Sequence, residues 1–168
     1  MSIKFNQDNQ IFHLNGKNIS YVFRINEVGY AEHLYFGETI AEDEISYLRC
    51  FGGRSCQPTV PGKEGFFYSD YAPEISFFGT GDYREPTVCV TNELGDRLCE
   101  LLYDGYEIVP EKPAIKGMPS LKGGETLILH LLDKITGFGA DLYYTVYDDC
   151  SVIARRIVYK NKGEKEIA

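Results

Sequence analysis

The sequence predicts an all-β fold, an antiparallel β-sandwich, and three observations support this. Apolar and polar residues alternate with a period of two along much of the chain, whereas the spacing of amphipathic helices is almost absent. Glycine and proline interrupt this alternation at short intervals. The length of 168 residues fits one domain with a substantial core. Short strands with hairpin-length links favour two packed antiparallel sheets.

The first clear hairpin lies at residues 19–37. In residues 19–25, isoleucine, tyrosine and phenylalanine occupy alternate positions, and residues 31–37 alternate in the same way. The link, residues 26–30, contains Gly29 and is short enough for a turn. The two runs are therefore expected to pair as antiparallel strands.

Strand patterns return in the second half of the chain. Leu127, Leu129 and Leu131 alternate with more polar neighbours, which predicts one face packed on a core. Leu142, Tyr144 and Val146 repeat the pattern. We expect about eight or nine strands in all. Those of this half are residues 87–91, 97–109, 125–132, 138–147 and 151–159.

Residues 38–86 differ from the rest of the chain, because glycine, proline and aromatic residues replace the alternation. Long irregular segments in compact domains are usually functional or interfacial, which suggests an interface at residues 45–78. The alternative is a loop whose aromatic side chains cover a sheet edge. The aromatic residues concerned are Phe66, Phe67, Tyr68, Tyr71, Phe77 and Phe78.

Charge and length exclude several classes of protein. The chain has 17 Lys and Arg against 25 Asp and Glu, a net charge of −8, which disfavours nucleic acid and anionic membranes as partners. No apolar run approaches the ~20 residues that span a bilayer, and no leader pattern is seen, so we expect a cytoplasmic location. A (β/α)8 barrel, which needs ~250 residues, does not fit.

No cofactor or metal site is predicted. The five cysteines contain no C-x-x-C pair, and the three histidines are isolated from one another. Cys50 and Cys56 could close a short loop, although a reducing compartment disfavours a disulfide. Cys89 lies in an apolar run, where a thiol packs as a small hydrophobe.

Catalytic residues are not predicted in this chain either. Glycosidases use two carboxylates across one bond. Asp82 with Glu85 and Asp148 with Asp149 are the pairs available, but adjacent aspartates favour a turn and point to opposite faces of a strand. Serine-nucleophile and phosphate-loop motifs are absent from the sequence.

The most specific local string is residues 78–86. Asp82 and Arg84 are two apart and share a face of an extended segment, so they are candidates for a structural anchor of the long loop. The alternative is that they bind sugar hydroxyls. Tyr71 and Phe78 are candidates for stacking on a sugar ring, although a chain without tryptophan is a weak case for such a module.

Several short strings, in order along nearly the whole chain, resemble the N-terminal region of glycoside hydrolase family 36, the bacterial α-galactosidases. They are Ile11-Phe12-His13-Leu14, Ser20-Tyr21-Val22, Gly29-Tyr30, His33-Leu34-Tyr35-Phe36-Gly37, Gly79, Gly81-Asp82-Tyr83-Arg84-Glu85-Pro86, Tyr144-Thr145-Val146-Tyr147, Ser151-Val152-Ile153-Ala154-Arg155 and Asn161-Lys162-Gly163.

The resemblance implies that residues 1–168 form part of a galactose-mutarotase-like β-supersandwich, with the loop at about 38–86 inserted between strands. The implied parent enzyme removes terminal α-galactose from melibiose- or raffinose-type sugars, and its catalytic aspartates lie on a barrel further along the chain. The implied partners are that C-terminal barrel and neighbouring subunits. In some members this loop reaches a neighbouring active site, where acidic and basic side chains touch the sugar. The corresponding positions fall near Gly53 and Gly65, so Arg54 is the substitute candidate for the α-galactoside at the loop rim.

Two functions are therefore favoured, and a small stand-alone enzyme comes last because the sequence offers no nucleophile–base pair. The first is a non-catalytic N-terminal β-sandwich of an α-galactosidase that supports the barrel and the oligomer. The second is an independent carbohydrate-binding module that stacks sugars on tyrosine and phenylalanine.

Overall fold

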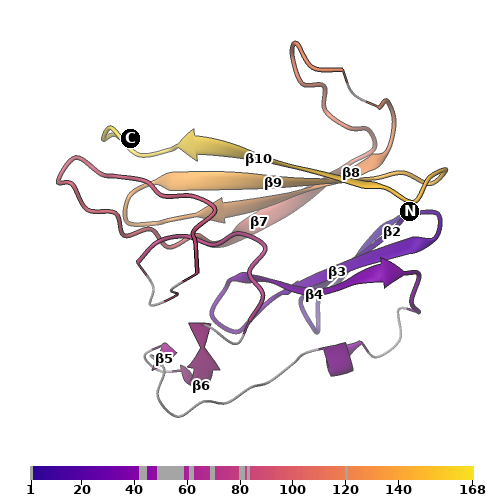
Figure 1. The fold of residues 1–168 in the computed structure, drawn as a ribbon, viewed down its shortest axis with the longest axis horizontal. Helices are drawn as coiled ribbons and strands as arrows, with labels where there is room; N and C mark the ends of the chain where they lie inside the picture. The colour runs from indigo at the N-terminus through magenta and orange to yellow at the C-terminus, as the bar shows by residue number, and fades with distance from the viewer. Residues whose placement is uncertain are drawn as a thin grey trace.

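Two four-stranded antiparallel sheets form the body of the protein, stacked one above the other (Figure 1). The computed structural model describes residues 2–41, 45–48, 59–60, 63–68, 71–79, 82, 84–119 and 121–168. The first sheet has the order β1-β2-β3-β4 and the second the order β10-β9-β8-β7. The bounds are β1 Ile3–Asn6, β2 Ile11–Asn15, β3 Ile19–Ile25, β4 Ala31–Glu38, β7 Leu102–Val109, β8 Glu125–Leu132, β9 Phe138–Val146 and β10 Ile153–Asn161.

The core lies between the facing sides of the two sheets. Leu127, Leu129 and Leu131 point into it from β8, which confirms the face predicted from their alternation. Across the core, Phe23 stacks on Tyr144 with ring centroids 5.0 Å apart. This interleaving of aliphatic and aromatic side chains confirms the all-β sandwich, and no α-helix occurs among the described residues.

The turn between β3 and β4 is built around one asparagine. The side-chain oxygen of Asn26 accepts hydrogen bonds from the backbone N–H groups of Val28, Gly29 and Tyr30, at 3.0–3.1 Å. Gly29 has φ 105°, a left-handed conformation that glycine adopts without a steric penalty. The hairpin predicted at residues 19–37 is therefore present, with β4 extending to Glu38.

Three details of the strand prediction were wrong. Residues 87–91 form no strand and are held by isolated pairings, because no neighbouring strand runs beside them. The strand expected at 97–109 begins only at Leu102. Within the long loop, a short hairpin joins β5 (Thr59–Val60) and β6 (Lys63–Phe67), and a 3-10 turn, η1, spans Ser46–Leu48.

The aromatic residues of the long loop extend the core. Phe66, Tyr68, Tyr71 and Phe77 are buried and gather around Tyr30 at the start of β4. Tyr71 stacks on Tyr30 with centroids 5.7 Å apart and planes at 12°. These rings do more than cover a sheet edge, because they belong to the same buried cluster as the sandwich interior.

Other expectations concern cysteines and membranes. Cys50 and Cys56 lie outside the described residues, and Cys89, Cys99 and Cys150 carry free thiols. Within the described ranges, no helix has the length and apolar character that crossing a bilayer would require.

Truncating a core leucine should destabilise the protein strongly. Leu129 is fully buried, so Leu129→Ala should cost about 2–5 kcal/mol in the free energy of unfolding, through lost burial and a residual cavity. Chemical denaturation provides the measurement. Leu94, which is 79% exposed, serves as the control, since Leu94→Ala should change that free energy by less than about 0.5 kcal/mol. Equal losses in the two variants would contradict this position of the core.

Candidate functional site

A buried carboxylate, Glu74, joins the long loop to both sheets. Its side chain has no exposed surface. Its oxygens accept hydrogen bonds from the hydroxyls of Tyr21 on β3, at 2.7 and 2.8 Å, and of Tyr144 on β9, at 2.7 Å. His33 Nδ1 on β4 lies 3.0 Å from Oε1, and a guanidinium nitrogen of Arg155 on β10 lies 2.9 Å from Oε2.

Backbone pairing brings Glu74 to this position. The N–H of His33 donates to the carbonyl of Ala72, and the N–H of Glu74 donates to the carbonyl of Ala31. Residues 72–74 thus lie along the outer edge of β4 as a short extra rung, and Glu32 pairs with Pro73. The carboxylate then reaches across the end of the core to Tyr144 and Arg155 in the other sheet.

The surroundings keep Glu74 ionised. Burial by itself raises the pKa of this carboxyl, but the hydrogen bond from His33, the charge of Arg155 and the two tyrosine hydroxyls outweigh it, so the pKa lies below its ordinary value. Burial and the nearby carboxylate raise the pKa of Tyr21 and Tyr144, which therefore stay neutral donors. Arg155 also covers the ring of Tyr144, at 5.0 Å from its centroid.

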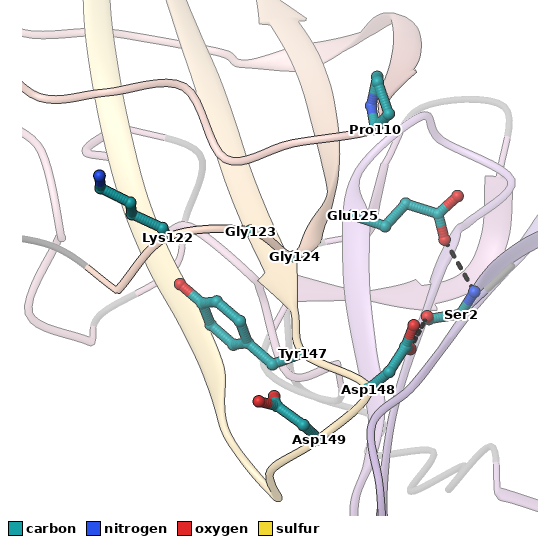
Figure 2. A pocket seen from close by; sticks show the side chains of 9 residues that line it. All are labelled: Ser2, Pro110, Lys122, Gly123, Gly124, Glu125, Tyr147, Asp148 and Asp149. Atoms are coloured by element: carbon teal, nitrogen blue, oxygen red, sulfur yellow. Dashed lines mark hydrogen bonds between the residues drawn. The ribbon is translucent and has the colours of Figure 1, made fainter.

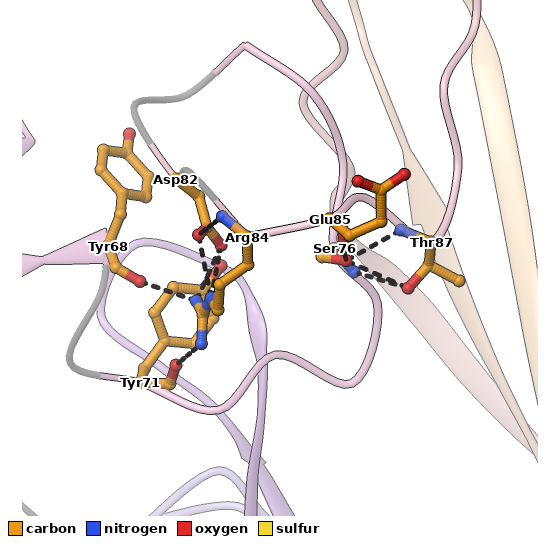
Figure 3. Close-up of polar contacts among 7 residues, drawn as sticks. All are labelled: Tyr68, Tyr71, Ser76, Asp82, Arg84, Glu85 and Thr87. Carbon is orange, nitrogen blue, oxygen red and sulfur yellow. Dashed lines mark hydrogen bonds and ion pairs between the residues drawn. The ribbon is translucent and has the colours of Figure 1, made fainter.

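Asp82 and Arg84 form an ion pair within the same loop (Figure 3). A guanidinium nitrogen of Arg84 lies 2.7 Å from Asp82 Oδ2. The same guanidinium donates to the backbone carbonyls of Tyr71, at 2.8 Å, and Tyr68, at 2.9 Å. Arg84 therefore contacts the preceding chain at two residues, in both cases through a main-chain carbonyl. The role of Arg84 as an anchor of the loop stays a prediction, and its bonds to two main-chain carbonyls are consistent with that role.

The charges of this pair stabilise each other. Hydrogen bonding to Asp82 raises the pKa of Arg84. Burial raises the pKa of Asp82, but the hydrogen bonds and charge of Arg84 outweigh it and lower that pKa overall. Next to the pair, Ser76 and Thr87 exchange hydrogen bonds, and the Ser76 hydroxyl also donates to the carbonyl of Glu85 (Figure 3).

The two aromatic residues predicted to contact sugar, Tyr71 and Phe78, differ in how far they are exposed. Tyr71 is 6% exposed, with one ring face against Tyr30 and Arg84 at 5.7 Å from its ring centroid, so no open face remains for a pyranose. Phe78 is 45% exposed, with Arg97 at 5.2 Å from its ring centroid. Arg54 lies outside the described residues, so its contact with substrate stays a prediction.

An open pocket of about 470 Å³ lies where the N-terminal segment meets the β9–β10 turn (Figure 2). Glu125 accepts hydrogen bonds from the backbone N–H groups of Ser2, at 2.8 Å, and Ile3, at 2.9 Å. The hydroxyl of Ser2 bonds to Asp148. These two carboxylates thus bond the N-terminal segment to β8 and to the β9–β10 turn. Asp149 and Lys122 complete the charged lining.

The carboxylates weighed as glycosidase pairs therefore have structural partners on at least one side. Asp82 is bound by Arg84, and Asp148 by Ser2. Within the described part of the chain, no group of three or more histidine, cysteine or acidic side chains is placed to hold a metal ion.

The sequence profile of the glycosyl hydrolase family 36 N-terminal domain matches residues 29–168. The chain belongs to this family. It is 34% identical to alpha-galactosidase Mel36A of Lactobacillus acidophilus over 98% of its length, and 34% identical to a probable alpha-galactosidase C of Aspergillus flavus over 95%. It spans only 24% and 21% of those two relatives.

Solved structures of the family have the same fold. The family 36 alpha-galactosidase AgaB of Geobacillus stearothermophilus is similar with a TM-score of 0.90 and 29% identity, over 99% of this chain and 23% of that one. A variant of AgaA from the same organism, solved in complex with raffinose, is similar with a TM-score of 0.87 and 28% identity, over 94% of this chain and 23% of that one.

Glu74→Gln should destabilise the protein and alter its response to acid. At pH 7 we expect a loss of about 3 kcal/mol in the free energy of unfolding, because Arg155 loses its buried counter-charge. Since the folded-state pKa of Glu74 lies below its unfolded value of about 4.3, the charged carboxylate contributes above that pH and its contribution is lost as pH falls further. The wild type should therefore lose more stability than the variant between about pH 5 and pH 3.

Chemical denaturation across this pH range provides the measurement. Glu93→Gln is the matched control, because Glu93 pairs with Lys165 at the exposed surface and should cost less than about 1 kcal/mol. Parallel pH profiles for the wild type and Glu74→Gln would show that Glu74 carries no such role.

Arg84→Lys tests the contacts of Arg84 with Asp82 and with the carbonyls of Tyr68 and Tyr71. Lysine keeps the charge but lacks the planar fork that reaches two carbonyls and Asp82 together, so we expect a loss of about 1–2 kcal/mol in the free energy of unfolding. A double-mutant cycle with Asp82→Asn should give a coupling energy of about 1 kcal/mol. A coupling energy of zero would mean that the two side chains stabilise the protein independently.

Proposed function

We propose that this chain serves as the non-catalytic N-terminal β-sandwich of an α-galactosidase that hydrolyses terminal α-galactosides of the melibiose and raffinose type. The observation that carries the proposal is the family match over residues 29–168 in a chain that spans about a quarter of its relatives. The variant of AgaA that was solved with raffinose supports the substrate class, since 23% of its chain is similar to 94% of this one.

The proposed task of the domain is support. The sandwich would carry the catalytic barrel and contribute to the oligomer, with residues 1–168 acting as one domain and the loop at 45–78 lying at an interface. Glu74 and Arg84 favour this role, because Glu74 bonds the loop to both sheets and Arg84 bonds two main-chain carbonyls within the loop. A loop fixed at its base can present its tip at a constant position on the rim of an active site. The cytoplasmic location stays a prediction.

A catalytic role for the chain alone has little support among the described residues. The two carboxylates of a glycosidase must lie about 5–9 Å apart, on either side of the bond that is cleaved, within a cleft. Glu74 is enclosed, Asp82 is neutralised by Arg84, and Asp148 holds Ser2. In the family, by the resemblance of the sequence, the catalytic aspartates lie on the barrel.

Hydrolysis assays test the proposal directly. The 168-residue chain should show no turnover of a chromogenic α-galactoside. A chimera in which it replaces the matching N-terminal quarter of the Lactobacillus acidophilus relative should hydrolyse that substrate, whereas the same relative without this quarter should lose most of its activity. Turnover by the chain alone that disappears on substitution of one Asp or Glu would overturn the proposal, as would full activity without the quarter.

Calorimetric titration separates this function from an independent sugar-binding module. The isolated chain should show no binding of galactose, melibiose or raffinose at millimolar concentrations. Phe78 is the exposed aromatic candidate, so binding that is lost in Phe78→Ala would favour the module instead.

A further inference from the structure

Residues 88–91, which follow a bend at Thr87, form an extended edge that is only partly paired. At one end, the N–H of Thr91 donates to the carbonyl of Ala168 at 2.7 Å, and the N–H of Ala168 donates to the carbonyl of Thr91 at 3.0 Å. Asn92 and Ile167 form an antiparallel bridge next to this rung. An antiparallel ladder therefore begins here, and its register is set by these two pairs of residues.

The opposite side of the same segment is also occupied. The N–H groups of Thr87, at 3.0 Å, and of Val88, at 3.3 Å, both donate to the carbonyl of Ser76, and Phe77 and Val88 form a parallel bridge. In an extended chain, the N–H and C=O groups of successive residues point to opposite sides, and those of residues two apart point to the same side. Those of Cys89 therefore face the side on which Thr91 bonds Ala168. Within the part of the chain that the structure describes, Cys89 has no backbone hydrogen-bond partner.

Side chains along this edge already follow the pattern of a half-buried strand. Val90 is buried and Val88 packs against the sandwich core, whereas Cys89 is exposed. Ile167, on the partner side of the ladder, packs against the same core. A strand that continued this ladder would therefore place every second side chain over the core. This explains why the sequence has the signature of a strand where the structure has none.

We propose that residues 88–91 are a strand-docking edge, and that its occupant is an extended antiparallel segment of the longer family 36 polypeptide. This rests on the proposed function, in which the chain works as part of a protein about four times as long. Open edges with free backbone groups are templates for strand addition. A second copy of the chain fits less well, because Ile167 and Ala168 already cover one end of the edge.

Adding a short tail to the chain tests whether the edge accepts a strand. A C-terminal Val-Thr-Val-Thr tail continues the register, with its second residue opposite Cys89 and its valines on the core side. Amide hydrogen exchange at Cys89 should slow by about tenfold compared with a chain that carries a Gly-Ser-Gly-Ser tail. A tail with proline at its second position removes the N–H that would donate to Cys89, and it should restore fast exchange.

Two results in the chain without a tail bear on the occupant. Fast exchange at Cys89 with elution as a monomer supports the proposal. Slow exchange together with elution as a dimer would assign the edge to a second copy and overturn it. Unchanged exchange at Cys89 with the Val-Thr-Val-Thr tail would overturn it as well.

The chimera described above separates the failure of this proposal from the failure of the proposed function. Cys89 should be protected from exchange in the chimera, and Cys89→Pro, which deletes that N–H, should lower its melting temperature more than Cys89→Ala does. A chimera that protects Cys89 but is inactive would overturn the proposed function alone. An active chimera with Cys89 unprotected would overturn the docking edge alone.

Discussion

The structure depends on one charged group that is enclosed by the protein and shared between layers. Glu74 receives a tyrosine hydroxyl from each sheet and a guanidinium from β10, so the two sheets and the loop meet at a single carboxylate. An isolated ion in this position would cost several kcal/mol of desolvation. Four donors offset that cost only when they arrive together, and so the position of the loop is coupled to the packing of the sheets.

The same coupling explains how a long irregular segment belongs to a sandwich. The loop contributes Phe66, Tyr68, Tyr71 and Phe77 to the buried cluster around Tyr30. Apolar burial provides much of the attraction, while Glu74 adds directional bonds to both sheets and Arg84 adds directional bonds within the loop. Hydrophobic packing thus stabilises the loop against the sandwich, and hydrogen bonds and ion pairs give it a specific position.

Local pattern was enough to predict much of the fold and only part of the site. The faces of β8 and β9 follow from alternation, because each residue's orientation depends on its immediate neighbours. The contact between Asp82 and Arg84 could be predicted for the same reason, since they are only two positions apart. Glu74 was missed because its partners lie 41 to 81 residues away, and no local signal joins them. Residues 87–91 were assigned to a strand from their composition, but a strand also needs a neighbour, which composition does not supply.

Arg84 bonds main-chain atoms of the loop, which has a consequence for how the sequence can diverge within the family. Its guanidinium binds main-chain carbonyls of residues 68 and 71, and a carbonyl is present whichever side chain a position carries. A substitution that changes only the side chain at either position leaves the carbonyl available to Arg84. Related proteins could therefore carry different side chains at positions 68 and 71 and still keep these two main-chain contacts.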